Sequence, residues 1–112
     1  MSENFKFSAV FIKHPTNEGV FLKHFFGKED NDALNNMEVH IVPSFQVAPH
    51  THEDSTEYFY VVDGDGEFGD GNEWLAISKG DAFKAPLGMV HAIRNSSHQT
   101  LVLFSTFSPA VR

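Results

Sequence analysis

Four residues of this chain have side chains that commonly bind metal ions, and they fall in two short runs. His50, His52 and Glu57 lie in PHTHEDSTEYFYVVDG, and His91 lies in GDAFKAPLGMVHAIRN. Three imidazoles and one carboxylate are enough to hold one divalent transition metal ion, and such donors suit Fe, Mn, Ni, Zn or Cu. In a five- or six-coordinate ion they leave one or two positions free, as in sites that bind water, oxygen or substrate.

Strand geometry places some of these side chains together and separates others. His50 and His52 are two residues apart, so they face the same side of an extended strand. Glu57 is an odd number of residues from His52, and an unbroken strand would turn it to the opposite face. The polar insert Glu53-Asp54-Ser55-Thr56 predicts a bend or bulge that brings Glu57 back. A regular strand from His52 through Glu57 would break the site.

Short apolar alternations between turn residues predict an all-β domain. Met37, Val39 and Ile41 are expected on one face of their strand, and a short helix is expected at Asp30 to Asn36. The tail from Ser108 to Arg112 is expected to be loose. The predicted strands are Phe5–Ile12, Val20–Phe26, Met37–Val42, Phe45–Val47, Glu57–Val62, Glu67–Phe68, Trp74–Ile77, Ala82–Ala85, His91–Arg94 and Thr100–Phe107, with the first two forming a hairpin.

Length, composition and charge limit the class of protein. The chain has 112 residues, no cysteine and a formal charge of −7. The length and the lack of cysteine predict one domain without disulfides or thiolate sites. The negative charge argues against nucleic acid or an anionic membrane as a partner. No segment resembles a signal peptide or a membrane span, so a cytoplasmic protein is expected. The twelve phenylalanines indicate a Phe-rich core or, alternatively, an aromatic wall around a ligand.

The two runs resemble the two motifs of the cupin superfamily. The first family motif is Gly, five residues, His-x-His, three or four residues, Glu, six residues, Gly. The chain matches it from His50 to Gly64, with Ser44 in place of the opening glycine. The second motif is Gly, five residues, Pro-x-Gly, two residues, His, three residues, Asn. It is matched at every position, by Gly80, Pro86, Gly88, His91 and Asn95.

This resemblance implies a cupin-type double-stranded β-helix, also called a jelly-roll barrel. Residues 1–112 would form a single cupin domain with its metal-site core at about residues 37–107. His50, His52, Glu57 and His91 would bind one divalent metal ion, and Asn95 would be structural. A homodimer is implied as well, which would cover apolar edge strands. Since some members of the family lack metal, an empty site at the barrel mouth is the alternative.

Two functions remain open at this stage. The first is an enzyme in which the ion binds a small oxygenated metabolite and Glu57 acts as ligand and proton acceptor, as in dioxygenase, isomerase or lyase chemistry. The second is a non-catalytic cupin that binds or senses a small molecule or a metal. In either case the expected cavity wall is Phe45, Val47, Phe59, Phe83, Met89, Ile93 and Phe104.

No second acid or base stands out in the sequence. Tyr58 and Tyr60 alternate with Glu57 and are expected outside the barrel. His40 is expected to be exposed or at an interface, because it lies opposite Met37, Val39 and Ile41. His98 falls in a predicted turn, and a role at the site is not expected for the remaining two histidines, His14 and His24.

Overall fold

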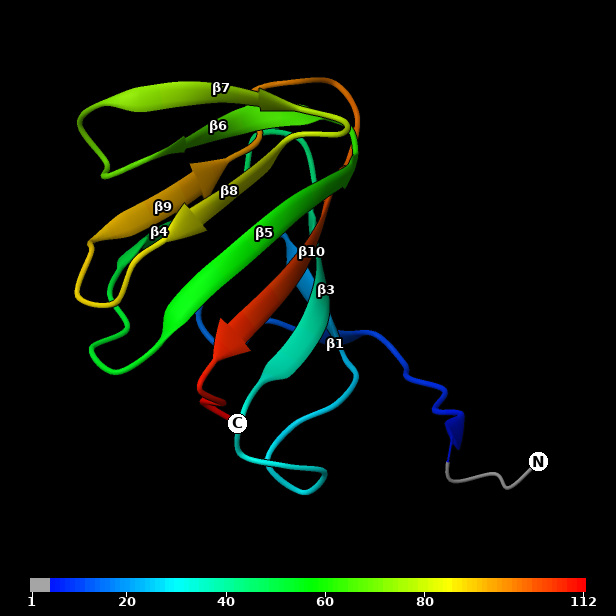
Figure 1. The fold of residues 1–112 in the computed structure, drawn as a ribbon. Helices are drawn as coiled ribbons and strands as arrows, with labels where there is room; N and C mark the ends of the chain where they lie inside the picture. The colour runs from blue at the N-terminus through cyan, green and yellow to red at the C-terminus, as the bar shows by residue number, and fades with distance from the viewer. Residues whose placement is uncertain (1–4) are drawn as a thin grey trace.

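Ten β-strands make up the regular structure of residues 5–112, the part of the chain that the computed structural model describes (Figure 1). No α-helix occurs among these residues, and none of their segments is a helix that could cross a membrane. The strands are β1 (Ile12–Lys13), β2 (Val20–His24), β3 (Asn35–Ile41), β4 (Gln46–His50), β5 (Thr56–Asp63), β6 (Asp65–Gly69), β7 (Trp74–Ser78), β8 (Ala82–Ala85), β9 (His91–Arg94) and β10 (Leu101–Ser108).

The strands form two antiparallel sheets that face each other, as Figure 1 shows. The larger sheet has the order β1-β2-β3-β10-β5-β8, and the smaller one has the order β4-β9-β6-β7. Consecutive strands β4, β5 and β6 lie in alternating sheets, so the chain crosses repeatedly between the two layers. This is the predicted all-β jelly-roll barrel, and it brings residues of both sheets to one interior.

The interior is filled by alternate residues of the central strands. Val39 and Ile41 of β3 are buried, as predicted, while Met37 packs at the edge of the same cluster. The core is mainly aliphatic, with Val20, Leu22, Val61, Ile77, Ile93, Leu101 and Leu103. The prediction of a Phe-rich core is therefore only partly right, because Phe59, Phe68 and Phe107 are the buried ones among the twelve phenylalanines.

The predicted strand at Phe5–Ile12 is wrong for most of its length. Only Ile12 belongs to a strand, where it pairs with Leu22, and the chain before it extends away from the barrel (Figure 1). Phe5 is 75% exposed and Phe7 is 53% exposed. An apolar segment adopts strand structure only where a neighbouring strand offers hydrogen bonds and packing, and this segment has no such neighbour within the described chain.

Two other local predictions fail because polar side chains bind the backbone. The expected helix at Asp30–Asn36 is a turn and bend followed by the start of β3 at Asn35, and Asn31 Oδ1 accepts the N–H of Ala33 at 2.8 Å. Such side-chain bonds compete with helix formation. The tail is not loose, since Val111 N–H donates to Asn35 Oδ1 at 2.8 Å and Lys28 N–H donates to the Arg112 carbonyl at 2.8 Å.

Two residues of the motif segments lie in neighbouring loops, since Ser44 N–H donates to the Asn95 carbonyl at 3.0 Å. Asn95 is buried, and its amide donates to the carbonyl oxygens of Ile41 and Gln99 at 2.8 and 2.7 Å. Ser44, which stands where the family motif has glycine, has a φ of +76°. The left-handed turn is thus kept without the residue that adopts it most easily.

We expect Ser44→Gly to be more stable than Ser44→Ala, because only glycine avoids the steric cost of a positive φ. The difference should be about 1 kcal/mol, or roughly 4–8 °C in melting temperature for a domain of this size. Thermal unfolding followed by circular dichroism measures it. Since Ser44 is exposed, loss of its side chain adds little, and equal stability of the two variants would show that the turn carries no strain.

Candidate metal centre

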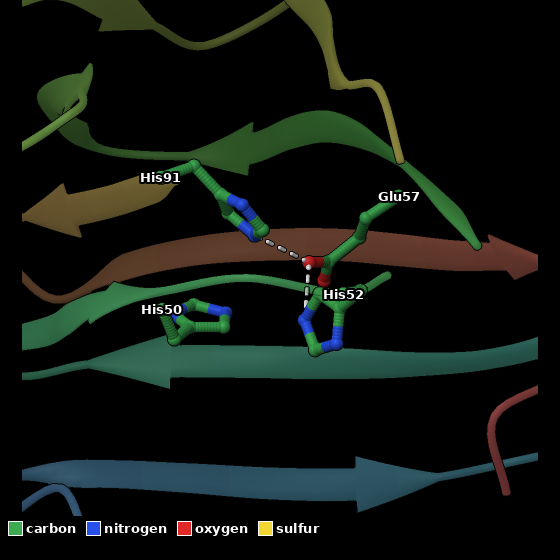
Figure 2. A group of neighbouring side chains, drawn as sticks. All are labelled: His50, His52, Glu57 and His91. Atoms are coloured by element: carbon green, nitrogen blue, oxygen red, sulfur yellow. Dashed lines mark hydrogen bonds and ion pairs between the residues drawn. The ribbon is translucent and has the colours of Figure 1, made fainter. Parts of the chain in front are cut away.

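Four side chains converge between the two sheets, as Figure 2 shows. His50 ends β4, His52 follows it, Glu57 lies in β5 and His91 begins β9. One potential ligand atom from each residue lies within 4.8 Å of all the others. Nitrogen and oxygen atoms that lie this close together could all reach one metal ion. The four residues therefore form a group that would hold a single divalent ion.

The chain bends between His52 and Glu57, where the odd number of residues separating them requires a break in the strand. β4 ends at His50, a bend occupies Glu53 and Asp54, and β5 begins at Thr56. The pairing of β4 with β9 also shifts register between Val47 and His50. Consequently His52 Nε2 and Glu57 Oε1 are 3.6 Å apart despite the odd separation in sequence, and the regular strand that would have broken the site is absent from this segment.

Main-chain carbonyls orient two of the three imidazoles. Nδ1 of His50 donates to the Ala48 carbonyl at 2.7 Å, and Nδ1 of His91 donates to the Met89 carbonyl at 3.0 Å. A carbonyl only accepts, so each Nδ1 carries a hydrogen and each Nε2 faces the other ligands. Bonds of this kind commonly fix the ring of a metal-binding histidine. The loop before His91 is joined to the first motif, since Gly88 N–H donates to the His52 carbonyl at 2.8 Å.

Glu57 is the buried acid around which the group is built, with 4% of its surface exposed. His91 Nε2 donates to Oε1 at 3.1 Å, and the Ser105 hydroxyl donates to Oε2 at 2.5 Å. Ser105 is fully buried on β10 and was missed by the sequence analysis. Strand alternation could have predicted its position. Alternate residues of β10 point inward, and Ser105 is the polar residue in the inward series Leu101, Leu103, Ser105 and Phe107.

The protonation states follow from burial and from Glu57. Burial lowers the pKa of His50 and His52, and this effect outweighs the attraction of Glu57. Burial also opposes the charge of His91, but hydrogen bonds to Glu57 and to the Met89 carbonyl raise its pKa overall. With both ring nitrogens donating, His91 is the imidazole that holds a second proton beside the carboxylate.

His52 provides the test of whether the group suits a metal. Its Nε2 is buried and has no hydrogen-bond partner in the described structure. A buried nitrogen without a partner costs free energy, and a cation bound among the four ligand atoms would satisfy it. The neutral imidazoles and the ionised carboxylate are the forms that bind a metal ion, so the residues present fit a divalent transition metal.

A cavity of about 320 Å³ adjoins this group and is lined by His50, His52 and Glu57. Of the predicted wall residues, Val47, Phe59 and Ile93 line it. The other four do not. Phe83 and Met89 pack against the core, Phe104 stacks on Phe25, and Phe45 is 39% exposed. Phe104 lies on the outer face of β10, Phe45 and Met89 lie outside the strands, and Phe83 shares the face of Phe59 but stacks on its ring within the core.

His14 is a cavity residue that the sequence analysis missed. It precedes the turn between β1 and β2, is half-buried and lines the cavity with Thr16 and Asn17. No spacing motif links it to the four ligands, so only the fold brings it there. Tyr58 and Tyr60 are exposed as predicted, and His98 lies exposed in a bend. His40 is half-buried next to Glu38 and the ring of Phe11.

Solved structures similar to this chain are cupins. A protein from Thermotoga maritima described as a predicted oxalate decarboxylase has 25% identity and a TM-score of 0.79, with 91% of this chain and 92% of that chain covered. KdgF from a Halomonas species has 27% identity and a TM-score of 0.75, with 89% of this chain and 87% of that chain covered. An RmlC-like cupin from Shewanella frigidimarina has 23% identity and a TM-score of 0.80, with 99% of this chain and 95% of that chain covered.

Comparison at the sequence level gives the family. No curated protein matches the chain significantly. The cupin domain model matches residues 37–107, which contain all four converging side chains, both motifs and the strands from β3 to most of β10. With this match, with two facing antiparallel sheets and with cupins among its structural neighbours, the chain belongs to the cupin family.

Proposed function

We propose that this protein is a mononuclear metal-dependent cupin that acts on a small oxygenated metabolite. His50, His52, Glu57 and His91 would hold the ion. The observation that carries the proposal is their convergence within 4.8 Å beside an accessible cavity, with the buried Nε2 of His52 lacking any other partner. Fe, Mn, Ni, Zn and Cu ions all suit these ligands.

Each residue has a defined part in such a site. A bound ion would act as a Lewis acid toward an oxygen of the substrate. His50 and His52 stay neutral because burial lowers their pKa. Ser105 holds one oxygen of Glu57, leaving the other to face His91 and His52. Glu57 is therefore positioned to accept a proton from a substrate as well as to bind the ion.

An enzyme of dioxygenase, isomerase or lyase type is the first candidate. In support, one similar protein is described as a predicted oxalate decarboxylase, which is a lyase by name. A non-catalytic binding or sensing cupin is the second candidate. It is favoured by one observation: besides His50, His52 and Glu57, His14 is the only titratable residue among the described residues that line the cavity. Product formation across a panel of small oxygenated substrates, compared with Glu57→Gln, separates the two candidates.

We expect the metal to be lost when either His52 or His91 is replaced by alanine. An ion at one hundred times its dissociation constant stabilises the native state by about 2.7 kcal/mol, which is roughly 10 °C or more in melting temperature for a domain of this size. The untagged protein and both variants are analysed for bound metal and melted before and after chelation. His98→Ala is the matched control, since His98 is exposed and outside the cavity. Metal retained by both ligand variants would contradict the assignment.

Metal affinity should rise with pH through the region just above 6.5, the ordinary pKa of histidine. The pKa of His91 is raised, so its second proton remains there as pH rises past 6.5 and must leave before the ion binds. His50 and His52 are already neutral in that range. Titration calorimetry in buffers of different ionisation enthalpy should show about one proton released per ion near neutral pH, falling toward zero at alkaline pH. Release that does not depend on pH would contradict this account.

We further propose that the protein is a cytoplasmic homodimer joined through its N-terminal segment. Strand β1 is an edge of the larger sheet, and the segment before it exposes Phe5, Phe7 and Phe11. Exposed apolar edges of this kind tend to be covered by another chain.

Light scattering after size exclusion should give twice the chain mass of 12.5 kDa. Phe7→Glu combined with Phe11→Glu should shift the protein toward monomer. Leu75→Glu, at an equally exposed apolar position on β7, should not. A monomeric wild-type protein would rule out the dimer.

A further inference from the structure

The cavity beside the four ligand residues contains no fixed positive charge. None of the eight lysines and arginines lines it, and all eight lie within the described residues 5–112. Some are engaged elsewhere: Arg94 binds Glu67 at 2.9 Å and lies 3.9 Å from the ring centre of Trp74, while Lys13 pairs with Glu18 at 2.9 Å. A bound ion would therefore be the only strong positive charge that a ligand meets in the cavity.

His14 is the one other cavity residue that could become cationic, and its hydrogen bonds oppose this. Its Nδ1 accepts the N–H of Thr16 at 3.1 Å and the N–H of Asn17 at 3.0 Å. A proton on Nδ1 would break both bonds, so the neutral ring with its hydrogen on Nε2 is the form that the turn favours. Burial and the nearby His50 lower the pKa of His14 in the same direction.

The charges at the site can be counted. A divalent ion contributes two positive charges, Glu57 one negative charge and the three imidazoles none, which leaves one positive charge for the ligand to neutralise. The remaining wall is mostly apolar, formed by Leu22, Met37, Val39, Val47, Phe59 and Phe107. A second negative charge on the ligand would face this wall, where His14, Thr16 and Asn17 offer neutral polar groups but no positive charge. Burial of a charge without a partner is strongly unfavourable.

We propose that the cavity selects a small oxygen-chelating ligand that carries one negative charge, at the metal end, and an apolar body. This inference rests on the proposed function, because the chelating end needs the ion. It excludes dicarboxylates and sugar acids with an extra carboxylate as preferred ligands. It favours molecules such as a 2-oxo or 2-hydroxy monoacid with a branched alkyl or aromatic group. At about 320 Å³ the cavity lies at the lower end of the usual range for small-molecule sites.

The test compares two probes that chelate metals through the same 2-oxo acid group. 2-Oxoisocaproate ends in a branched alkyl group, and 2-oxoglutarate ends in a second carboxylate at similar size. Protein loaded with Co(II) is analysed for metal content and then titrated with each probe by calorimetry and visible absorption. We expect 2-oxoisocaproate to bind on the order of tenfold more tightly or better. Equal affinity, preference for 2-oxoglutarate, or binding of neither probe by the loaded protein would overturn the inference.

Failure of the underlying metal site is visible separately. If the protein does not retain cobalt before any probe is added, the proposed function fails and the inference falls with it. If cobalt is retained and the preference is missing, only the inference fails. The two results are therefore distinguished by the metal analysis alone.

A variant pair tests charge as the cause of the preference. Met37 is half-buried and lines the cavity, so Met37→Lys adds one cation there, and Met37→Gln adds polarity without charge. Both are checked for cobalt content. Met37→Lys should shift the affinity ratio toward 2-oxoglutarate by about tenfold, while Met37→Gln should stay close to wild type. An unchanged ratio in cobalt-loaded Met37→Lys would overturn the inference, and the wild-type comparison stands even if this variant does not fold.

Discussion

The buried carboxylate of Glu57 is the constraint on which the rest of the site depends. An ionised carboxylate removed from water is costly unless charges and hydrogen bonds compensate it. Here the compensation comes from His91 on β9 and Ser105 on β10, which both donate hydrogen bonds to Glu57. Each of them must therefore be held in place by its own strand or loop. These hydrogen bonds to Glu57 explain how segments far apart in sequence are joined at one place in the structure.

The two-sheet architecture is what meets this constraint. Glu57 and Ser105 lie on neighbouring strands β5 and β10 of the larger sheet, while His50 and His91 pair directly across β4 and β9 of the smaller one. The ligand group therefore spans the gap between the sheets, with its cavity bounded by both. The neighbouring strands β3 and β10 of the same sheet bury Val39, Ile41, Leu101 and Leu103 in the core. Packing of this kind would help to hold the four side chains in position for a metal ion.

The cavity has a polar end at His50, His52 and Glu57, a few neutral polar residues at His14, Thr16 and Asn17, and an apolar wall elsewhere. Since no lysine or arginine lines the cavity in the described chain, the net charge of a metal ion held by the four residues would decide which ligands are neutralised on binding. His14 adds a neutral donor that its own turn holds in one tautomer. Under the proposed function, the charge of the bound ion would thus be the main determinant of ligand class, because no lysine or arginine lines the cavity in the described chain.

The sequence by itself determined the fold class and the identity of the four converging residues. Motif spacing and strand alternation are local properties that can be read directly from the order of the residues. It also located the bend between His52 and Glu57, because the odd spacing left no other way to join them. Tertiary structure decided the rest. Phe5–Phe11 lacks a partner strand despite its apolar residues, the tail is held by Asn35, and Ser105 and His14 reach the site from segments with no motif. These outcomes depend on which segments become neighbours in space, and neighbours supply the hydrogen bonds and packing that local propensity cannot specify.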